Sequence, residues 1–400
     1  MFIFLKKKLN KYSIYLPNKN ECLLVKLIAL LEKKYLILLN TFKTMMQSIA
    51  ANGYPIVFGD NGYQYFNIFI EESNYSSIFI LTDTNSNEYC LSRFLPYLAT
   101  DKTIEIIEIE AGESEKNITN CVELWTTLTE LGGDRKSVLI NIGGGVITDI
   151  GGFVASTFKR GIDFIHIPTT LLAMVDASVG GKNGVDLGNL KNQIGVINIP
   201  KMVLIDTEYL TTLPQNEMRS GLAEMLKHGL IADAAYWAQF RELNQIDFAD
   251  FDNLIHRSIE IKNNIVMQDP TENGIRKALN FGHTLGHAIE SYFLENENKK
   301  TLLHGEAIAI GMILESYISW QKKLLSAADY LEIKNTINAV FETILFEETD
   351  IKPILDLLIH DKKNEYGKIQ FALLDGIGKI KINQEVENEL INKSFEDYKS

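Results

Sequence analysis

Three of the seven histidines of this chain lie between positions 283 and 304, in two motifs that contain glycine. His283 and His287 belong to GHTLGH and stand four positions apart, and His304 follows in LLHGE. Positions four apart share a face of a helix. A pair of imidazoles and a carboxylate is a common ligand set for a divalent metal, and three protein ligands leave one coordination position for a substrate. The cluster therefore predicts a metal site, and spacing alone admits both His283 and His287 as ligands.

A carboxylate and a lysine that share a helix face precede these histidines. They are Glu224 and Lys227 in GLAEMLKHG, three positions apart. Taken singly, a histidine in such a helix would more often have a structural role in the core or on the surface. The clustering of these residue types favours a metal site instead.

A glycine-rich turn follows the apolar run SVLINI, in INIGGGVITDIGG at residues 140–152. Three glycines between a buried strand and a helix let the backbone approach a phosphate and direct N–H groups toward it. The pattern is not G-x-G-x-x-G, and a tight strand-to-helix turn without a ligand would also explain it. Asp83 follows another apolar run, SIFILT, where open α/β sheets hold a ribose against a carboxylate, although a simple turn also uses aspartate.

Cations and hydroxyl groups gather in the next segment, which reads RGIDFIHIPTTLLAMVDASVGGKNGVDLGNLKN at residues 160–192. Thr169 and Thr170 end an apolar run, Lys182 follows two glycines, and Lys191 lies near the end of the segment. Lysine and arginine beside glycine-rich backbone suit an anionic ligand. Because the chain as a whole is acidic, cations concentrated here would focus the electric field on such a substrate.

The elements that must position these residues fall into two parts. Between residues 46 and 206, short apolar runs alternate with helical stretches such as 117–131, which predicts a Rossmann-like, doubly wound parallel sheet. The expected strands are 77–82, 103–109, 137–142, 164–167 and 202–205. Between residues 207 and 400 we expect a mostly helical domain that binds metal and substrate. Its expected helices are 217–231, 251–267, 274–294, 305–324 and 327–346, with a small hairpin at 368–374 and 379–382.

The composition is that of an ordinary globular chain and argues against several classes of protein. The 400 residues carry a net charge of −13 at pH 7, and a dedicated nucleic-acid binder needs an excess of cations instead. Three cysteines, Cys22, Cys90 and Cys121, cannot form a disulfide framework, so a reducing cytoplasm is expected.

Residues 1–45 differ from the remainder because they contain no glycine and carry nine lysines against two glutamates. Charged residues interrupt the apolar run at 23–39, so neither a membrane span nor a signal peptide is expected. A basic amphipathic helix on a membrane or a partner would fit this composition. We favour a dispensable extension, with translation starting at Met45 or Met46.

Six motifs together resemble those of the 3-dehydroquinate synthase family, the sugar-phosphate cyclases of the shikimate pathway. They are GGGVITD, RGIDFIHIPTTLLAMVDASVGGK, LGNLKNQIG, LPQNEMRSGLAEMLKHGLI, LNFGHTLGHAIE and LHGEAIAIGM. The resemblance runs from about residue 46 to the end of the chain. It implies a lyase that uses catalytic NAD and a divalent metal, zinc or cobalt, to convert 3-deoxy-D-arabino-heptulosonate 7-phosphate into 3-dehydroquinate and phosphate. It also implies a cytoplasmic homodimer that has a small-molecule substrate and neither nucleic acid nor a membrane as partner.

The resemblance assigns roles to individual residues. The implied metal ligands are Glu224, His283 and His304, and His287 is given to the substrate instead. The residues implied to contact NAD are Asp83, Asn85, Gly112, Glu113, Lys116, Gly144, Gly145, Val146, Asp149, Thr169, Thr170, Lys182, Lys191, Tyr209, Leu210, Thr211 and Thr212. Those implied to contact the substrate are Asp176, Lys182, Asn192, Lys227, Lys262, Arg276, Asn280, His287 and Arg160, the last reaching across a dimer interface. The implied catalytic set is Lys182, Lys227, Arg276, His287 and Glu272, with Glu272 as a proton acceptor.

Two positions depart from the family pattern without removing a charged or liganding group. Thr148 stands where a fourth glycine is usual, and Asn183 stands where threonine is commoner. Thr148 would tighten the glycine turn slightly.

Three alternatives remain at this point. Sugar-phosphate cyclases of the deoxyinosose or epi-valiolone type tend to change the residues at Lys262, Asn280 and His287, which stand here as in dehydroquinate synthases. Glycerol and metal-dependent alcohol dehydrogenases begin their metal set with aspartate and need no group of cations for a doubly anionic substrate. A binding or scaffold protein on this fold would carry a damaged site.

Overall fold

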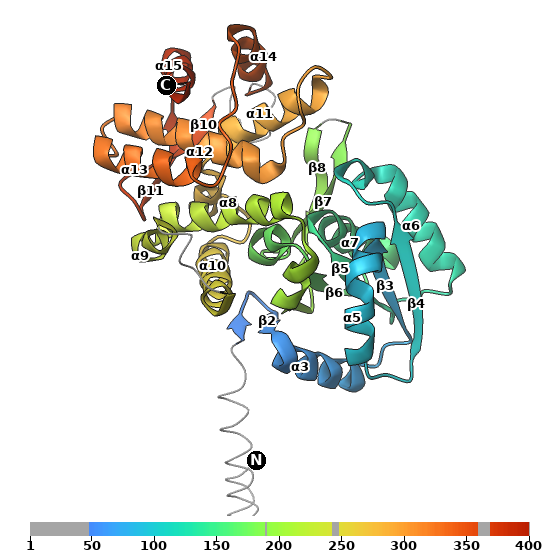
Figure 1. Ribbon diagram of the computed structural model, residues 1–400. Helices are drawn as coiled ribbons and strands as arrows, with labels where there is room; N and C mark the ends of the chain where they lie inside the picture. Colours follow the sequence, from blue (N-terminus) through green and yellow to red (C-terminus); the bar gives the residue numbers. More distant parts are fainter. Residues whose placement is uncertain (1–47, 189, 242–247, 359–368, 400) are drawn as a thin grey trace, which may run out of the picture. The chain divides into compact units, whose positions relative to one another are not determined.

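The computed structural model describes residues 48–188, 190–241, 248–358 and 369–399, and residues 48–400 belong to one compact unit. The lysine-rich segment 1–45 and both candidate start sites lie outside the described residues. Within the compact unit, an α/β part is followed by a mostly helical part (Figure 1). This order confirms the predicted fold class.

A seven-stranded sheet forms the centre of the α/β part, in the order β1-β2-β9-β6-β5-β3-β4. Its strands are β1 (Ile49–Ala50), β2 (Pro55–Phe58), β3 (Ser77–Asp83), β4 (Thr103–Ile109), β5 (Val138–Gly143), β6 (Asp163–Pro168) and β9 (Met202–Ile205). Neighbouring strands are parallel except β1 and β2, and the five predicted strands are confirmed. The chain leaves β3 toward one edge of the sheet and β5 toward the other. Their carboxyl ends therefore form the switch point at which open α/β sheets bind ligands.

Helices cover both faces of this sheet. The principal ones are α3 (Gly59–Glu72), α6 (Ile118–Glu130) and α7 (Gly145–Thr157). Shorter helical turns are α4 (Thr84–Ser86), Asn87–Leu91, α5 (Ser92–Phe94), Leu95–Tyr97, Glu113–Glu115, Phe158–Arg160, Ala173–Ala177 and Thr207–Thr212. Alternate residues of β3 point to opposite faces: Phe79 packs with Leu124 of α6 and Phe153 of α7, whereas Ile78 belongs to the other apolar cluster. That second cluster continues into the helical part, so one core joins the sheet to the helices that carry the histidines.

The helical part is built around one buried helix. Its elements are α8 (Gln215–Ala232), α9 (Ala234–Ala238), α10 (Phe248–Gln268), α11 (His283–Glu295), α12 (His304–Gln321), α13 (Ala327–Asn338), α14 (Glu348–Leu358), α15 (Asn388–Tyr398) and the hairpin β10 (Gln370–Leu374) and β11 (Ile380–Glu385). α12 packs among α8, α11, α13 and α15, which explains why it is apolar on all sides. No helix in the described part of the chain is long and apolar enough to cross a membrane.

The helix predicted at 274–294 begins only at His283. Residues Ile275–Asn280 form a 3-10 turn instead, and Gly282 has a φ of +76°, which favours glycine. The carboxylate of Glu315, fully buried on α12, accepts the backbone N–H groups of Gly282 at 2.7 Å and Leu285 at 3.2 Å. The buried carboxylate of Glu315 therefore caps the N-terminus of α11, on either side of His283.

A hairpin that the sequence did not predict links the two parts. It consists of β7 (Lys182–Leu187) and β8 (Leu190–Ile197), and it extends from the α/β part toward α11 (Figure 1). Gly184 and Gly195 let its strands approach closely, because a Cβ on either would lie 2.6 Å from a backbone oxygen of the opposite strand.

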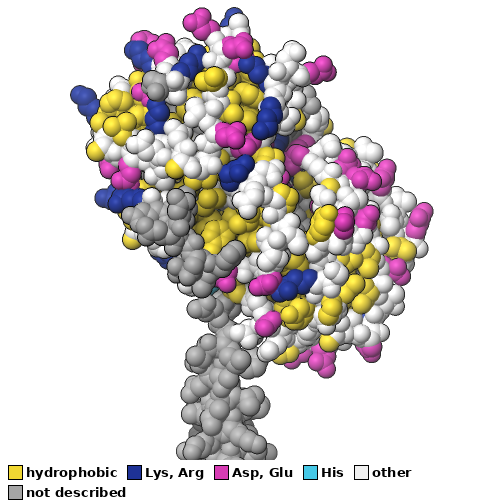
Figure 2. All heavy atoms as spheres, viewed as in Figure 1, with side chains coloured by type: hydrophobic (Ala, Val, Ile, Leu, Met, Phe, Trp, Pro, Cys, Tyr) yellow, Lys and Arg dark blue, Asp and Glu magenta, His cyan; other side chains and the backbone are white. Residues whose placement is uncertain are grey.

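On the face shown in Figure 2, charged side chains of both signs lie scattered among apolar ones.

Candidate active site

One cavity of about 1500 Å³ opens at the carboxyl ends of β3 and β5 and reaches the β7–β8 hairpin, α8, α11 and α12. The predicted residues that line it are Asp83, Asn85, Gly112, Glu113, Lys116, Gly144, Gly145, Val146, Asp149, Thr169, Thr170, Asp176, Lys182, Lys191, Asn192, Tyr209, Thr212, Lys227, Lys262, Glu272, Arg276, Asn280, His283, His287 and His304. The predicted residues that do not line it, all within the described part of the chain, are Arg160, Leu210, Thr211 and Glu224. Residues from all six motifs thus meet in one cavity.

The glycine turn forms the start of α7 at one end of this cavity. Gly144 is the residue before α7, and a Cβ there would lie 3.0 Å from the Thr170 side chain. The buried hydroxyl of Thr148 donates to the carbonyl oxygens of Gly144 at 3.3 Å and Gly145 at 3.1 Å. Threonine is therefore accommodated inside the helix, and the N–H groups of the turn still point toward the cavity end of α7.

Asn183, the second departure from the family pattern, holds the base of the hairpin. Its amide donates to the carbonyl oxygens of Gly181 at 3.0 Å and Asn198 at 2.8 Å. A Cβ at Gly152 would lie 1.9 Å from its side-chain oxygen. The asparagine side chain at position 183 therefore depends on the glycine opposite to it.

A buried lysine connects three acids near the glycine turn. Lys116 Nζ lies 3.1 Å from Glu113, 3.4 Å from Asp149 and 3.9 Å from Asp186. Burial alone would lower the pKa of Lys116, but the three carboxylates raise it well above its usual value. The cation thus offsets a local excess of negative charge at this end of the cavity.

The histidines converge at the other end. The candidate ligand atoms of His283, His287 and His304 all lie within 4.8 Å of one another. Glu224, fully buried on α8, places Oε1 3.4 Å from His283 Nε2 and 3.9 Å from His304 Nε2. This oxygen accepts no hydrogen bond from the described residues, and Oε2 is paired with Lys227. A buried carboxylate oxygen that faces two ring nitrogens is the donor set of a divalent metal site, so these residues fit such an ion.

The opposite ring nitrogens of both histidines face acceptors. His283 Nδ1 lies 3.0 Å from the carbonyl oxygen of Phe281, and His304 Nδ1 lies 3.3 Å from Glu290 Oε2. A hydrogen on each Nδ1 leaves the Nε2 lone pairs directed at Glu224, as metal ligation requires. Burial, followed by the charge of Lys227, lowers the pKa of His283 to about 4, which keeps its imidazole neutral. For His304, Glu290 outweighs burial and raises the pKa.

Three cations and a loop surround the remaining part of the cavity. Lys262 Nζ lies 2.7 Å from Asp176 Oδ1, and Lys182 pairs with Glu272. Asn280 Nδ2 donates to Glu272 Oε1 at 3.2 Å. Arg276, buried, donates through Nη1 to the carbonyl oxygen of Pro270 at 2.7 Å, while its Nε has no hydrogen-bond partner among the described residues. These groups are suited to an anionic ligand with more than one acidic group.

A second cluster of possible metal ligands also has the spacing of a metal site. It consists of Asp176, Glu224 and His228. Asp176 is paired with Lys262, however, and Glu224 is paired with Lys227. Two ammonium groups therefore occupy the positions from which a second cation would bind, and the histidine cluster is the better candidate.

Comparisons with known proteins identify the family. The models described as 3-dehydroquinate synthase N-terminal and C-terminal match residues 106–220 and 221–364. A 3-dehydroquinate synthase of Parabacteroides distasonis is 41% identical over 333 residues, which cover 83% of this chain and 94% of that protein. The chain belongs to the 3-dehydroquinate synthase family. Its activity is that of a 3-dehydroquinate synthase of the shikimate pathway, and the alternatives of another cyclase, a dehydrogenase or a scaffold are set aside.

Solved structures of related cyclases support the same fold. A 2-deoxy-scyllo-inosose synthase complexed with carbaglucose-6-phosphate, NAD+ and Co2+ superposes with a TM-score of 0.78 and 25% identity, over 88% of this chain and 99% of that one. A 2-epi-5-epi-valiolone synthase of Streptomyces hygroscopicus with NAD+ and Zn2+ has the same TM-score and identity, over 88% and 98%. Related cyclases therefore bind NAD+ and a divalent metal, and this dehydroquinate synthase carries a histidine cluster fit for such an ion.

Sequence reasoning missed several residues that hold the site together. Glu290 follows His287 by three positions in GHTLGHAIE, so helical spacing could have found it. Asp186 and Ser220 had no comparable signal, because they reach the site through the unpredicted hairpin and through a helix crossing. Asp269 was also missed. Its carboxylate accepts the backbone N–H groups of Asn273, Gly274 and Arg276 and so shapes the loop that carries Glu272.

Proposed function

We propose that this 3-dehydroquinate synthase uses NAD as a catalytic cofactor and one divalent metal ion, Zn2+ or Co2+, both bound in the 1500 Å³ cavity. One observation carries the proposal. The same cavity is lined by the glycine turn at the sheet's switch point, by the histidine cluster and by the cationic side chains of Lys182, Lys262 and Arg276. A reaction that joins redox chemistry, a metal and a doubly anionic substrate needs these three features in one place.

The nucleotide would lie along the end of the cavity at β3 and α7. Asp83 and Asn85 follow β3, where a carboxylate meets ribose hydroxyls in this fold. The turn Gly144–Val146 would present backbone N–H groups to the pyrophosphate. The remaining residues proposed for this site are Gly112, Glu113, Lys116, Asp149, Thr169, Thr170, Lys182, Lys191 and Tyr209–Thr212. When bound, NAD would supply a hydride acceptor and return the hydride within the same turnover.

The metal would be held by Glu224, His283 and His304. The support is the 3.4 Å and 3.9 Å approach of the two Nε2 atoms to a carboxylate oxygen that has no hydrogen-bond donor among the described residues. When bound, the ion would act as a Lewis acid that lowers the pKa of substrate hydroxyls. His287 lies on the same face of α11 and would face the substrate.

The substrate would be oriented by the cationic side chains. Lys182, Lys262 and Arg276 would bind its carboxylate and phosphate, together with Asp176, Asn192, Lys227 and Asn280. The sugar acid would be oxidised at one hydroxyl, lose phosphate by β-elimination, be reduced again, open its ring and close it by an aldol step. Glu272 would accept a proton and His287 would hold one near the reacting hydroxyls.

We further propose a cytoplasmic homodimer in which residues 46–206 bind the nucleotide and residues 207–400 bind the metal. Arg160 does not line the cavity of its own chain. It stands beside Lys159 in a turn where both have positive φ, at +72° and +48°. This position is consistent with a role in the site of a second copy.

The test is phosphate release from the heptulosonate 7-phosphate by the purified chain with NAD and Zn2+. We expect release without accumulation of NADH, and loss of turnover in excess chelator with recovery on addition of Zn2+ or Co2+. Lys262→Met should abolish most turnover, whereas Lys201→Met, which removes an exposed partner of Asp163, should not. Full activity with the metal removed, confirmed by elemental analysis, would contradict the metal assignment, and accumulation of NADH would contradict a catalytic role for NAD.

A further inference from the structure

A buried acid that has no role in the proposal above lies between the two ends of the cavity. Glu290 is on α11, two turns after His283, and its side chain is 6% exposed. Its Oε2 lies 3.3 Å from His304 Nδ1, and its Oε1 lies 2.6 Å from Lys191 Nζ. Each carboxylate oxygen therefore contacts a different functional residue.

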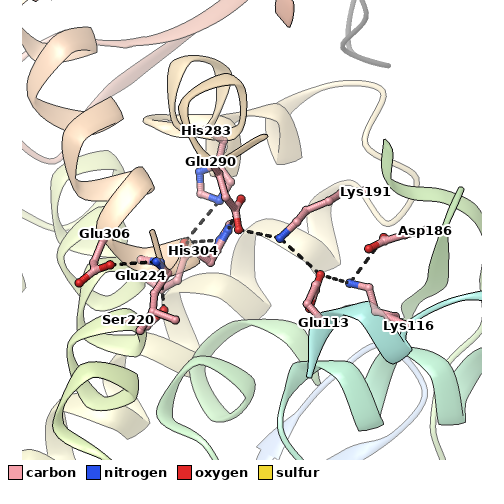
Figure 3. A network of polar contacts seen from close by, with 12 residues as sticks. Glu113, Lys116, Asp186, Lys191, Ser220, Glu224, His283, Glu290, His304 and Glu306 are labelled. Atoms are coloured by element: carbon pink, nitrogen blue, oxygen red, sulfur yellow. Dashed lines mark hydrogen bonds and ion pairs between the residues drawn. The ribbon is translucent and has the colours of Figure 1, made fainter. Parts of the chain in front are cut away.

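These contacts continue in both directions (Figure 3). On one side, His304 Nε2 faces the buried carboxylate of Glu224. On the other side, Lys191 Nζ also lies 3.4 Å from Glu113, which is paired with Lys116. Glu290 is thus the residue at which the charged contacts of the helical part meet those of the hairpin and the α/β part.

We propose that Glu290 is a positioning residue for this synthase, whose carboxylate orients the His304 ring for metal binding while Lys191 holds that carboxylate in place. The inference rests on the proposed role of His304 as a metal ligand. A carboxylate that accepts the Nδ1 hydrogen of a histidine fixes the ring and its tautomer, and it raises the basicity of the Nε2 atom that binds the ion.

Only a carboxylate satisfies both neighbours. His304 Nδ1 and Lys191 Nζ are both donors in this arrangement, and an ionised carboxylate offers two accepting oxygens. A glutamine would accept from one of them and turn its NH2 group toward the other. The His304 ring or the Lys191 chain would then have to move, because one of these two donors would face an NH2 group instead of an accepting oxygen.

The matched control is another buried acid that contacts α11. Asp350 is 2% exposed, pairs with Lys299 at 2.9 Å and accepts a hydrogen bond from Tyr292 of α11 at 2.6 Å. Asp350→Asn therefore removes a buried ion pair beside the same helix without touching the histidine cluster. It reports what the loss of such a pair does to stability alone.

The experiment compares wild type, Glu290→Gln, Glu290→Asp and Asp350→Asn, each with NAD present. Zn2+ affinity is measured by competition with a chromophoric chelator, and the visible absorption of the Co2+-loaded chain reports the ligand geometry. We expect Glu290→Gln to bind Zn2+ about 10- to 100-fold more weakly than wild type and to change the Co2+ spectrum. Asp350→Asn should lower only the thermal midpoint.

Glu290→Asp keeps the charge but withdraws the oxygens by about one C–C bond, roughly 1.5 Å. We expect metal affinity between those of wild type and Glu290→Gln, and this variant decides the question if Glu290→Gln does not fold. Wild-type Zn2+ affinity and Co2+ spectrum in the folded Glu290 variants would overturn the inference and leave the metal proposal intact. If wild type itself binds neither ion, the proposed metal function fails, and the inference fails with it.

Discussion

The helices that carry two of the proposed metal ligands cross at Gly305, and this crossing makes a sharp prediction. Gly305 follows His304 on α12, and its N–H donates to Ser220 Oγ at 2.9 Å. Ser220 lies one turn before Glu224 on α8. A Cβ at position 305 would lie 2.3 Å from both the Cα and the carbonyl oxygen of Ser220. Backbone atoms cannot rotate away, so Gly305→Ala must separate the two helices.

The size of the effect follows from these distances. Non-bonded carbon atoms settle at about 3.5 Å, so α12 must retreat from α8 by about 1 Å. Metal–ligand distances tolerate only about 0.2 Å, and His304 moves with the backbone of Gly305. We therefore expect Zn2+ affinity to fall at least tenfold. Overpacking costs about 1–3 kcal/mol of stability, offset by up to about 1 kcal/mol from replacing glycine in a helix.

The control is Gly133→Ala, whose Cβ would lie 2.7 Å from the carbonyl oxygen of Leu128 in the α/β part. Both variants should unfold at lower temperature than wild type, but only Gly305→Ala should lose metal affinity in a chelator competition. A Gly305→Ala protein that binds Zn2+ like wild type would refute the argument that this helix crossing sets the spacing of His304 and Glu224.

Three further predictions test other parts of the site. His283→Ala should lose most of its metal, whereas His287→Ala should keep it and lose turnover by about two orders of magnitude; equal metal loss in mass spectrometry would make His287 a ligand. Lys116→Met leaves three acids without their buried cation. It should lower the free energy of unfolding, measured with denaturant, by about 3 kcal/mol and weaken NAD binding. The exposed control Lys201→Met should lower the free energy of unfolding by less than about 1 kcal/mol. Burial lowers the pKa of His166 to about 3, below its unfolded value of about 6.5. As the pH falls, this histidine is therefore protonated in the unfolded chain at a higher pH than in the folded chain. The free energy of unfolding consequently decreases as the pH drops from about 6.5 to 3. Wild type should lose about 3 kcal/mol more than His166→Gln between pH 7 and pH 4, and parallel pH profiles would contradict this.

The sequence by itself determined the features that depend on neighbouring residues. Alternation of short apolar runs with helical stretches predicted β3, β4, β5, β6 and β9, and long amphipathic stretches predicted the helical part. The histidine spacing in GHTLGH placed two imidazoles on one helix face, and their rings lie 5.1 Å apart. These predictions succeeded because local periodicity reflects which side of an element is buried.

Only the tertiary structure decided how distant segments meet. The β7–β8 hairpin escaped prediction because glycine and polar residues interrupt its alternation, yet it brings Lys191 within 2.6 Å of Glu290, 99 positions later. The late start of α11 depends on Glu315, a buried acid of the following helix. The approach of Glu224 to His283 and His304 depends on the crossing of α8 and α12 at Gly305. Such contacts depend on how whole helices and strands pack against one another. A local pattern of residues carries no information on the distances between these elements.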